Sequence, residues 1–267
     1  MLTDAQITAF AARLDEAERT RRQTRALSIL HPDATIADAY RIQDAWVDLK
    51  VKAGRVVKGH KIGLTSKAMQ TAVGIGEPDS GYLLDDMFFA DGGTVPKGRF
   101  IGLRVEAELA FVLRAPLEGA SVTLFDVLNA TDYVTPALEI LDTRIFRADP
   151  DTKAIRKVVD TIADNAANAG IVVGGRPFRP AEHDMRWIGA ICSKNGAVEE
   201  TGLAAGVLNN PATAIAWLAR SLAGQSRSLK AGEIVLSGSF IRPIEVGSGD
   251  TIVADYGPFG TVSCYFE

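Results

Sequence analysis

The sequence contains few of the residues that build disulfide frameworks or thiolate metal sites. Its two cysteines, Cys192 and Cys264, lie far apart and show neither metal-ligand nor redox spacing. We therefore expect both thiols to be reduced, packed and chemically inert.

Long apolar runs and an excess of positive charge are also absent. No stretch approaches the length of a transmembrane helix, and the N-terminal segment contains Asp4 and Asp15 where a secretory signal would be apolar. The net charge is -4 at pH 7, whereas nucleic-acid binding requires a concentrated basic surface. The short cluster of Arg19, Arg21 and Arg22 is better explained as the end of a helix. We expect a cytoplasmic protein without nucleic-acid or membrane partners.

Several familiar motifs are missing as well. The run Gly74-Ile75-Gly76 lacks the third glycine and the strand-to-helix context of a dinucleotide-binding loop. A Walker A motif, a Gly-x-Ser-x-Gly elbow and a His-Glu-x-x-His motif are all absent. Nucleotide binding and these hydrolase mechanisms are therefore disfavoured.

The rest of the composition, 47% hydrophobic and 23% charged over 267 residues, is typical of a globular protein. We expect one catalytic domain over 1–267, in which 1–55 form an N-terminal helical appendage and 56–267 a mixed β core. In the appendage, one helix is predicted after Thr3 or Asp4, where apolar residues recur at helical spacing.

A second helix is predicted from Thr35, which forms a capping-box pattern with Asp38, to a stop at Gly54. A third is predicted after Asn210 and Pro211. A strand running into a tight turn is expected at 56–64, and further strands at 105–113, 136–140, 170–173, 187–194, 233–236, 251–255 and 260–266. Many strands with few helices favour an α+β fold with a mixed, largely antiparallel sheet.

Two carboxylates occupy one face of the predicted strand at 105–113. Side chains alternate along a strand, so Arg104, Glu106 and Glu108 share the face opposite the apolar positions. At a rise of about 3.4 Å per residue, the two glutamates lie about 7 Å apart at their Cα atoms. A divalent cation would neutralise them. On alternation alone, they fit equally well as the solvent face of an edge strand, with Arg104 as an ion-pair partner.

A third carboxylate, Glu139, interrupts the apolar run 136–141. Three carboxylate ligands leave about half of an octahedral shell free, which suits Mg²⁺ or Mn²⁺ holding water and a chelating substrate.

A lysine between glycines is the other candidate. Lys61 in the run 59–67 could attract a substrate carboxylate or transfer a proton, although lysines in strands more often reach to the surface. The role of His60 is equally open. The turn-rich segment 73–82 is expected to be a long, lid-like loop containing Asp79.

Several runs together resemble the hydratase and decarboxylase family of meta-cleavage pathways, within the fumarylacetoacetate hydrolase superfamily. They are Gly59-His-Lys-Ile-Gly-Leu-Thr-Ser66, Glu77-Pro-Asp79, Leu84-Asp-Asp-Met87, Glu106-Ala-Glu-Leu-Ala110, Asn129-Ala-Thr-Asp-Tyr133 and Asp164-Asn-Ala-Ala-Asn168. Similar segments extend from about Arg25 to the C-terminus, and their combination is more specific than any one of them.

The resemblance implies that Glu106, Glu108 and Glu139 hold Mg²⁺ and that Lys61 and Asp79 are the acid and base. It also implies a mixed β-sheet core of the superfamily's C-terminal type and a homo-oligomer, a pentamer or decamer. The substrate-binding candidates within the similar segments are His60, Leu64, Thr65, Ser66 and Arg25.

The implied activity is a lyase reaction of aromatic-compound catabolism, in homoprotocatechuate degradation: hydration at C4 of a small unsaturated 2-oxo dicarboxylate. The distal carboxylate of that substrate needs a cation, for which Arg25, Lys157 and Arg242 are candidates. Rival activities within the family are a 4-oxalocrotonate-type decarboxylase and a 2-hydroxypenta-2,4-dienoate hydratase. A carbon-carbon hydrolase or isomerase of the superfamily, and a catalytically inactive partner subunit, are the more distant alternatives.

Overall fold

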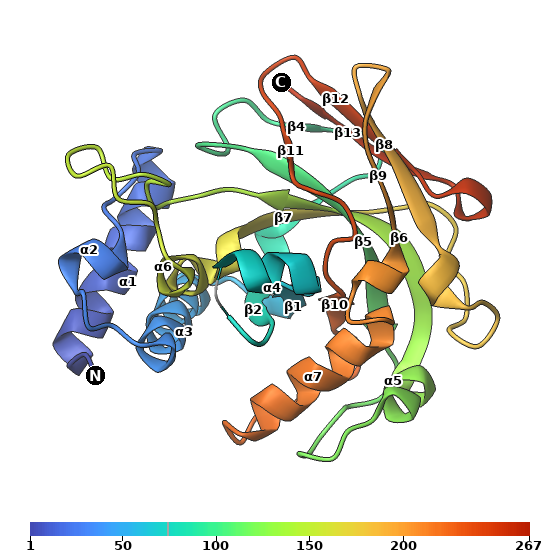
Figure 1. The fold of residues 1–267 in the computed structure, drawn as a ribbon, viewed down its shortest axis with the longest axis horizontal. Helices are drawn as coiled ribbons and strands as arrows, with labels where there is room; N and C mark the ends of the chain where they lie inside the picture. Colours follow the sequence, from blue (N-terminus) through green and yellow to red (C-terminus); the bar gives the residue numbers. More distant parts are fainter. Residues whose placement is uncertain (74) are drawn as a thin grey trace.

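The computed structural model describes residues 1–73 and 75–267 (Figure 1). Its α-helices are α1 (Asp4–Thr20), α2 (Leu27–Leu30), α3 (Ile36–Lys52), α4 (Lys67–Val73), α5 (Leu124–Ala130), α6 (Val158–Ala163) and α7 (Pro211–Ala223). Short 3-10 helices are η1 (Asp85–Met87), η2 (Asn165–Ala167), η3 (Met185–Trp187), η4 (Ala204–Gly206) and η5 (Gly257–Phe259). None of the described helices is both long enough and apolar enough to cross a membrane.

The strands form two sheets. They are β1 (Val57–Gly63), β2 (Asp79–Leu84), β3 (Phe88–Phe89), β4 (Gly93–Val95), β5 (Arg104–Leu113), β6 (Thr131–Leu141), β7 (Asn168–Val173), β8 (Gly189–Lys194), β9 (Ala197–Leu203), β10 (Ile234–Leu236), β11 (Ile244–Glu245), β12 (Thr251–Asp255) and β13 (Thr261–Phe266).

The first sheet has the order β2-β1-β10-β5-β6-β7-β3, with β11 added beside β5, and the second has the order β4-β13-β12-β8-β9. The pairs β1/β10, β3/β7 and β4/β13 are parallel, and the other pairs are antiparallel. The predicted α+β fold with a mixed, largely antiparallel sheet is therefore confirmed.

The helix boundaries follow the capping residues of the sequence. Thr3 caps α1, and its side chain accepts a hydrogen bond from the backbone N–H of Gln6. Thr35 caps α3 in a capping box with Asp38, and Asn210 caps α7. These caps satisfy N–H groups that have no partner inside the helix, and the predicted helix starts are confirmed.

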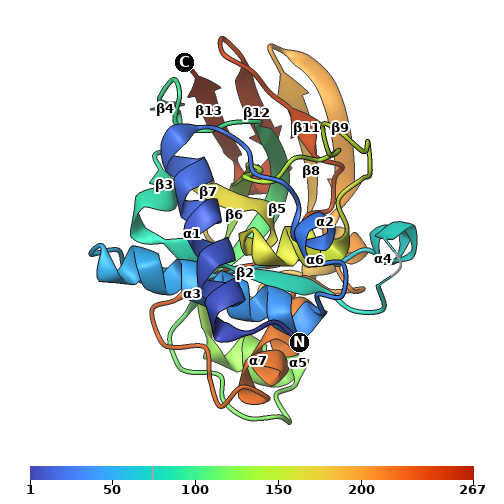
Figure 2. The same cartoon turned by 90° about the vertical axis from the view of Figure 1, so that its left-hand side faces the viewer.

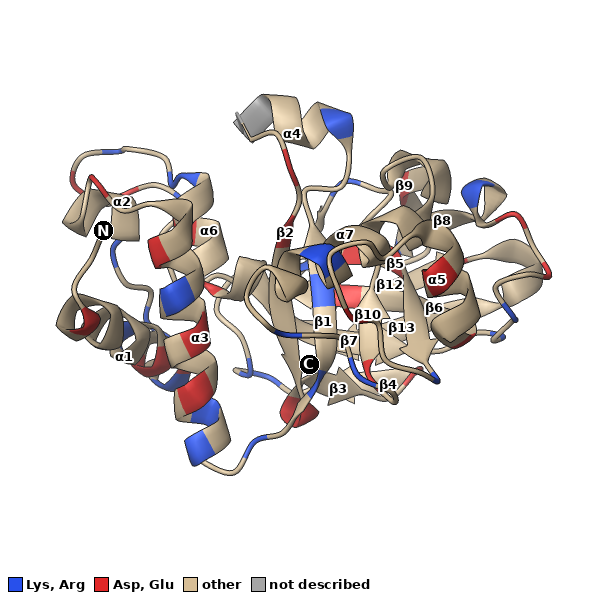
Figure 3. Cartoon of the chain, turned by 90° about the horizontal axis from the view of Figure 1, so that it is seen from below, with Lys and Arg blue, Asp and Glu red and all other residues tan. Residues whose placement is uncertain are grey.

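The N-terminal helices pack against one end of the first sheet (Figures 1 and 2). Their buried residues Phe10, Leu14 and Trp46 form a core with Leu84 of β2 and Ile162 of α6. Figure 3 shows Lys and Arg interspersed with Asp and Glu over α1 and α3. A larger core lies between the two sheets and α7 and includes the apolar face of β5, namely Val105, Ala107, Leu109 and Phe111. The predicted alternation along β5 is thus confirmed.

The segment predicted as one long loop, 73–82, is a loop only at 75–78 among its described residues. Val73 ends α4, and Asp79 begins β2, which pairs antiparallel with β1. Gly74, part of the rejected nucleotide motif, lies outside the described residues. The glycine, proline and aspartate of this stretch predict turns, but pairing with β1 overrides that local preference. The polar strand β9, which pairs with β8, had also not been predicted.

Candidate metal and acid-base site

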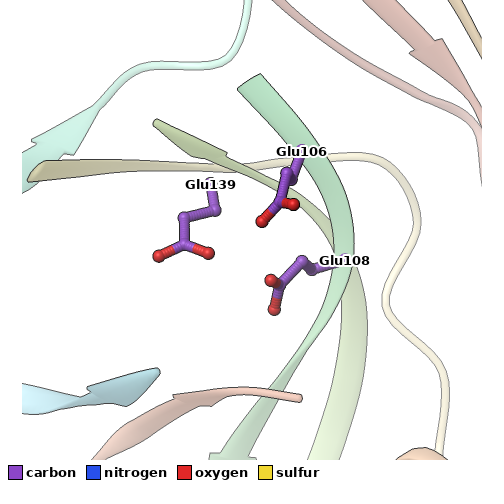
Figure 4. Close-up of side chains that lie close together, drawn as sticks. All are labelled: Glu106, Glu108 and Glu139. Carbon is purple, nitrogen blue, oxygen red and sulfur yellow. The ribbon is translucent and has the colours of Figure 1, made fainter. Parts of the chain in front are cut away.

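Three glutamates meet on one face of the first sheet. Glu106 and Glu108 are two residues apart on β5, and Glu139 on β6 lies directly opposite Glu106 in the antiparallel register. One carboxylate oxygen from each lies within 4.8 Å of the others. Figure 4 shows the three carboxylates pointing toward one another from the two strands. Glu108 and Glu139 have no exposed surface, and Glu106 is half-buried.

The hydrogen bonds of this cluster leave oxygens without partners. One oxygen of Glu108 accepts from the backbone N–H of Gly238 at 2.8 Å, and one oxygen of Glu139 accepts from Asn168 Nδ2 at 2.7 Å. The other oxygens, Glu108 Oε1 and Glu139 Oε2, are buried and have no hydrogen-bond partner among the described residues. Buried carboxylate oxygens normally have partners. Unpartnered, converging oxygens therefore fit a hard divalent cation.

Without a bound cation, the negative charges of the three glutamates would repel one another. Burial raises the pKa of Glu106 to about 8, and the neighbouring Glu139 adds to the effect. Burial and the same neighbour also raise the pKa of Glu108 well above its usual range. A bound cation would relieve this repulsion and favour the ionised forms.

Lys61 brings a positive charge to the cluster from β1. Its ammonium lies 3.2 Å from Glu139 Oε1 and donates to the backbone carbonyl of Ala166 at 3.0 Å. Burial by itself would lower the pKa of Lys61, but Glu139 and Asp79 outweigh it, and the pKa is raised. The Lys61 side chain is therefore held in its charged form.

Asp79 lies at the start of β2, opposite Gly63 of β1. It is 2% exposed, and its Oδ1 has no hydrogen-bond partner among the described residues. Burial raises the pKa of Asp79 to about 6, although Lys61 acts against this shift. A Cβ atom at Gly63 would lie 2.3 Å from Asp79 Oδ1. An alanine at position 63 would therefore displace the Asp79 carboxylate from its present position.

A cavity of about 1140 Å³ opens over these groups. Lys61, Asp79 and Glu106 line it, as do three of the predicted substrate-binding residues, Leu64, Thr65 and Ser66. The cavity thus places a substrate-sized space against the carboxylate cluster.

The other two predicted substrate-binding residues, His60 and Arg25, lie elsewhere. Neighbouring side chains of a strand point to opposite faces, so His60 points away from Lys61 and contacts Tyr82, with 5.0 Å between ring centroids. Burial lowers the pKa of His60 to about 3. Arg25 pairs with Asp149 at 2.7 Å and does not line the cavity.

The run 164–168 positions the site, a role that sequence reasoning had not given it. Asn168 holds Glu139, and Ala166 holds Lys61, as described above. The side-chain amide of Asn165 donates to the carbonyl of Tyr82 at 3.0 Å and accepts from its N–H at 2.8 Å, which joins the run to β2. Asp164 forms an ion pair with the buried Arg144.

The chain is similar over almost its whole length to a curated enzyme and to a solved structure. No family model matches the chain. It is 58% identical, over 97% of its length and 97% of the relative, to a 2-oxo-hept-4-ene-1,7-dioate hydratase from Escherichia coli. The structure of a 4-oxalocrotonate decarboxylase from Pseudomonas putida G7, complexed with magnesium and adipate, aligns with a TM-score of 0.94 and 34% identity, covering 100% of this chain and 99% of that one.

The fold is also shared with more distant structures. A fumarylacetoacetate hydrolase family protein from Yersinia pestis CO92 aligns with a TM-score of 0.58 and 20% identity, covering 79% of this chain and 94% of that one. The predicted superfamily fold is thereby confirmed.

Proposed function

Because this chain belongs to the hydratase and decarboxylase family of meta-cleavage pathways, we propose that it is the hydratase that converts 2-oxohept-4-ene-1,7-dioate to 4-hydroxy-2-oxoheptanedioate. The observation that carries this proposal is its near full-length similarity to a hydratase named for that substrate. The reaction would place the protein in homoprotocatechuate degradation, with residues 1–267 acting as one catalytic domain.

In this proposal Glu106, Glu108 and Glu139 hold Mg²⁺, and their unpartnered buried oxygens support the assignment. When bound, the cation supplies Lewis-acid stabilisation for the negative charge that develops on the 2-oxo group. Mn²⁺ satisfies the same oxygen ligands.

The roles that we propose for Lys61 and Asp79 follow from their protonation states. The raised pKa of Lys61 keeps it protonated, so it stabilises negative charge and donates hydrogen bonds to the substrate. Asp79, with a pKa of about 6, exchanges protons near neutral pH. It serves as the group that moves a proton from the enol hydroxyl to a carbon of the dienol. It then accepts a proton from the water that attacks C4 and returns it to C3, so that no net proton remains on the enzyme.

Leu64, Thr65 and Ser66 position the substrate along the cavity wall. Thr65 is 3% exposed and packs against Gly238, whose φ is +109° and where an added Cβ would lie 2.4 Å from Thr65 Oγ1. This contact joins the substrate-binding run to the backbone amide that holds Glu108.

The second sheet supports a homo-oligomer. Trp187, Ile191, Val198 and Leu203, on or beside β8 and β9, are between 46% and 73% exposed. Exposed apolar groups of this kind commonly mark interfaces. Light scattering after size exclusion distinguishes a pentamer or decamer from a monomer.

Turnover of 2-hydroxyhepta-2,4-dienedioate by the purified protein tests the activity. Loss of the dienol absorbance with Mg²⁺, its arrest by EDTA, and a 4-hydroxy-2-oxo diacid identified by NMR are the expected results. Glu106→Gln should abolish turnover, whereas Glu200→Gln, at another cavity carboxylate, should not. Release of CO₂ from 4-oxalocrotonate without hydration would instead make the protein a decarboxylase.

A further inference from the structure

The segment between β6 and α6 brings positive charge to the cavity. It covers residues 142–157, and Arg147, Arg156 and Lys157 all line the cavity wall. The backbone N–H of Arg156 donates to the carbonyl of Arg147 at 3.0 Å, and an isolated bridge forms one residue further along each arm. The segment therefore folds back on itself and places Arg147 beside Arg156.

A buried carboxylate holds this segment in place. Both oxygens of Asp149 accept from the guanidinium of Arg25, at 2.7 and 2.9 Å, and the Asp149 side chain has no exposed surface. Asp149 also accepts from the backbone N–H groups of Asp151 and Thr152. Arg25 thus anchors the segment that carries Arg156 and does not itself reach the cavity.

Arg156 has unused hydrogen-bonding capacity. It is half-buried, and one of its nitrogens donates to Thr143 Oγ1 at 2.9 Å. A guanidinium has five N–H donors in a planar fork. Among residues 1–73 and 75–267, no carboxylate oxygen lies within the 4.0 Å of an ion pair with Arg156.

The carboxylates that act on Arg156 from a distance are engaged elsewhere. Asp164 is paired with Arg144, and backbone N–H groups hold Asp160. Asp79 belongs to the proposed acid-base pair; burial raises its pKa, and the positive charge of Arg156 acts against that rise. Burial lowers the pKa of Arg156 despite these carboxylates. An anion entering the cavity would stabilise the charged guanidinium.

Arg147 is half-buried like Arg156 and has no ion pair among the described residues, but unlike Arg156 it has no side-chain hydrogen bond there that fixes its guanidinium. Three further cations of the cavity wall have partners or water. Arg242 is paired with Glu200 at 2.6 Å, and its side chain is 83% exposed. Arg104 is paired with Glu245 at 2.5 Å. Lys157 is exposed. An exposed or paired cation gains less from a substrate carboxylate than a half-buried one without a partner.

We propose that Arg156 binds the distal carboxylate of the substrate and makes the enzyme selective for dicarboxylates over monocarboxylates. This inference rests on the proposed function. The substrate's 2-oxo acid end faces the glutamate cluster, and its other carboxylate receives the guanidinium fork of Arg156. Thr143 fixes the direction of that fork.

Selectivity between two dienols tests the assignment. The ratio of kcat/KM for 2-hydroxyhepta-2,4-dienedioate to that for the monocarboxylate 2-hydroxyhexa-2,4-dienoate should fall about 10- to 100-fold in Arg156→Gln, from the usual worth of a hydrogen bond to a charged group. Arg156→Lys should recover part of it. Arg242→Gln is the matched control and should leave the ratio unchanged. An unchanged ratio in Arg156→Gln, or a larger loss in Arg147→Gln or Arg242→Gln, would overturn the proposal.

Equilibrium binding provides a readout that does not need turnover. Calorimetry on the Mg²⁺-loaded protein should show adipate binding weakened about 10- to 100-fold by Arg156→Gln, with pyruvate binding unchanged. Equal weakening of both ligands would indicate general damage to the site and overturn the proposal. If the wild-type protein binds adipate through Arg156 but does not hydrate the dienol, the proposed reaction fails while this assignment stands.

Discussion

Replacing Glu108 by glutamine should separate metal binding from folding. One Glu108 oxygen accepts from the N–H of Gly238, and the other is buried without a hydrogen-bond partner among the described residues. Glutamine keeps the first acceptor and the shape of the side chain. It also removes a carboxyl group whose ionised form is disfavoured in the metal-free protein, because burial and the neighbouring Glu139 and Glu106 raise the pKa of Glu108. The metal-free variant should therefore be at least as stable as the metal-free wild type.

The magnitude follows from linkage between binding and unfolding. At a Mg²⁺ concentration about 100 times its Kd, the wild type gains about 2.7 kcal/mol, which for a chain of this size raises Tm by about 5 to 10 °C. Loss of an outer partner of a metal ligand weakens binding about 10- to 100-fold, and loss of the ligand's own charge should reach the upper end. The same Mg²⁺ concentration then yields about 0.4 kcal/mol, or about 1 °C.

Differential scanning calorimetry measures the metal-free Tm in EDTA and the rise in Tm over a series of Mg²⁺ concentrations. Glu200→Gln is the control, because Glu200 also lines the cavity but pairs with Arg242. This control should show the full wild-type shift. A wild-type Mg²⁺ shift in Glu108→Gln would refute the ligand assignment. A metal-free Tm well below that of the wild type would show that Glu108 mainly supports the fold.

Three further predictions address pH and the acid-base pair. Because the folded-state pKa of Glu106 is raised to about 8, the folded metal-free protein retains a proton that the unfolded chain has released. Its free energy of unfolding should therefore fall by about 1.4 kcal/mol per pH unit for each such proton between about pH 5 and 8. The Tm measured in EDTA should fall over the same range, and a constant Tm would contradict this prediction. The affinity for Mg²⁺, measured by calorimetry, should rise with pH. Asp79→Asn should lower kcat about 100- to 10,000-fold in steady-state assays with Mg²⁺ binding retained, and a wild-type kcat would exclude Asp79 as the proton-transfer group. Gly63→Ala should also lower kcat because its Cβ would displace Asp79, whereas Gly76→Ala, which meets nothing within 4 Å, should not; equal rates would show that Asp79 tolerates the displacement.

Part of this structure is readable from local sequence. The alternation of Glu106 and Glu108 with apolar residues predicts both the strand and the shared face, because the side-chain period of a strand is fixed by its backbone. The capping residues Thr3 and Thr35 likewise predict their helices, since a cap bonds within one turn. Patterns of this kind depend on neighbours in the chain.

The rest depends on register and on partners distant in sequence. No local sequence pattern predicts that Glu139 lies opposite Glu106. The antiparallel register of β5 and β6 brings the two residues together. From the sequence alone, Arg25 is a candidate ligand for the distal carboxylate of the substrate, together with Lys157 and Arg242, and no pattern indicates Arg156. The structure distinguishes Arg156 from Arg25, because Asp149 occupies Arg25 while no carboxylate pairs with Arg156 among the described residues.

The run 164–168, one of the segments that resemble the family, positions side chains of the candidate site through its backbone conformation and its hydrogen bonds. Asn165, Ala166 and Ala167 have φ values of 53°, 49° and 61°, a left-handed conformation that costs about 1 to 3 kcal/mol for each non-glycine residue. This conformation turns the Ala166 carbonyl to Lys61 and leaves Asn168 facing Glu139. The pair of hydrogen bonds between Asn165 and Tyr82 and the ion pair of Asp164 with Arg144 offset the strain. A backbone that is unfavourable by itself thus fixes the Lys61 ammonium and the Glu139 carboxylate, on which the proposed chemistry depends.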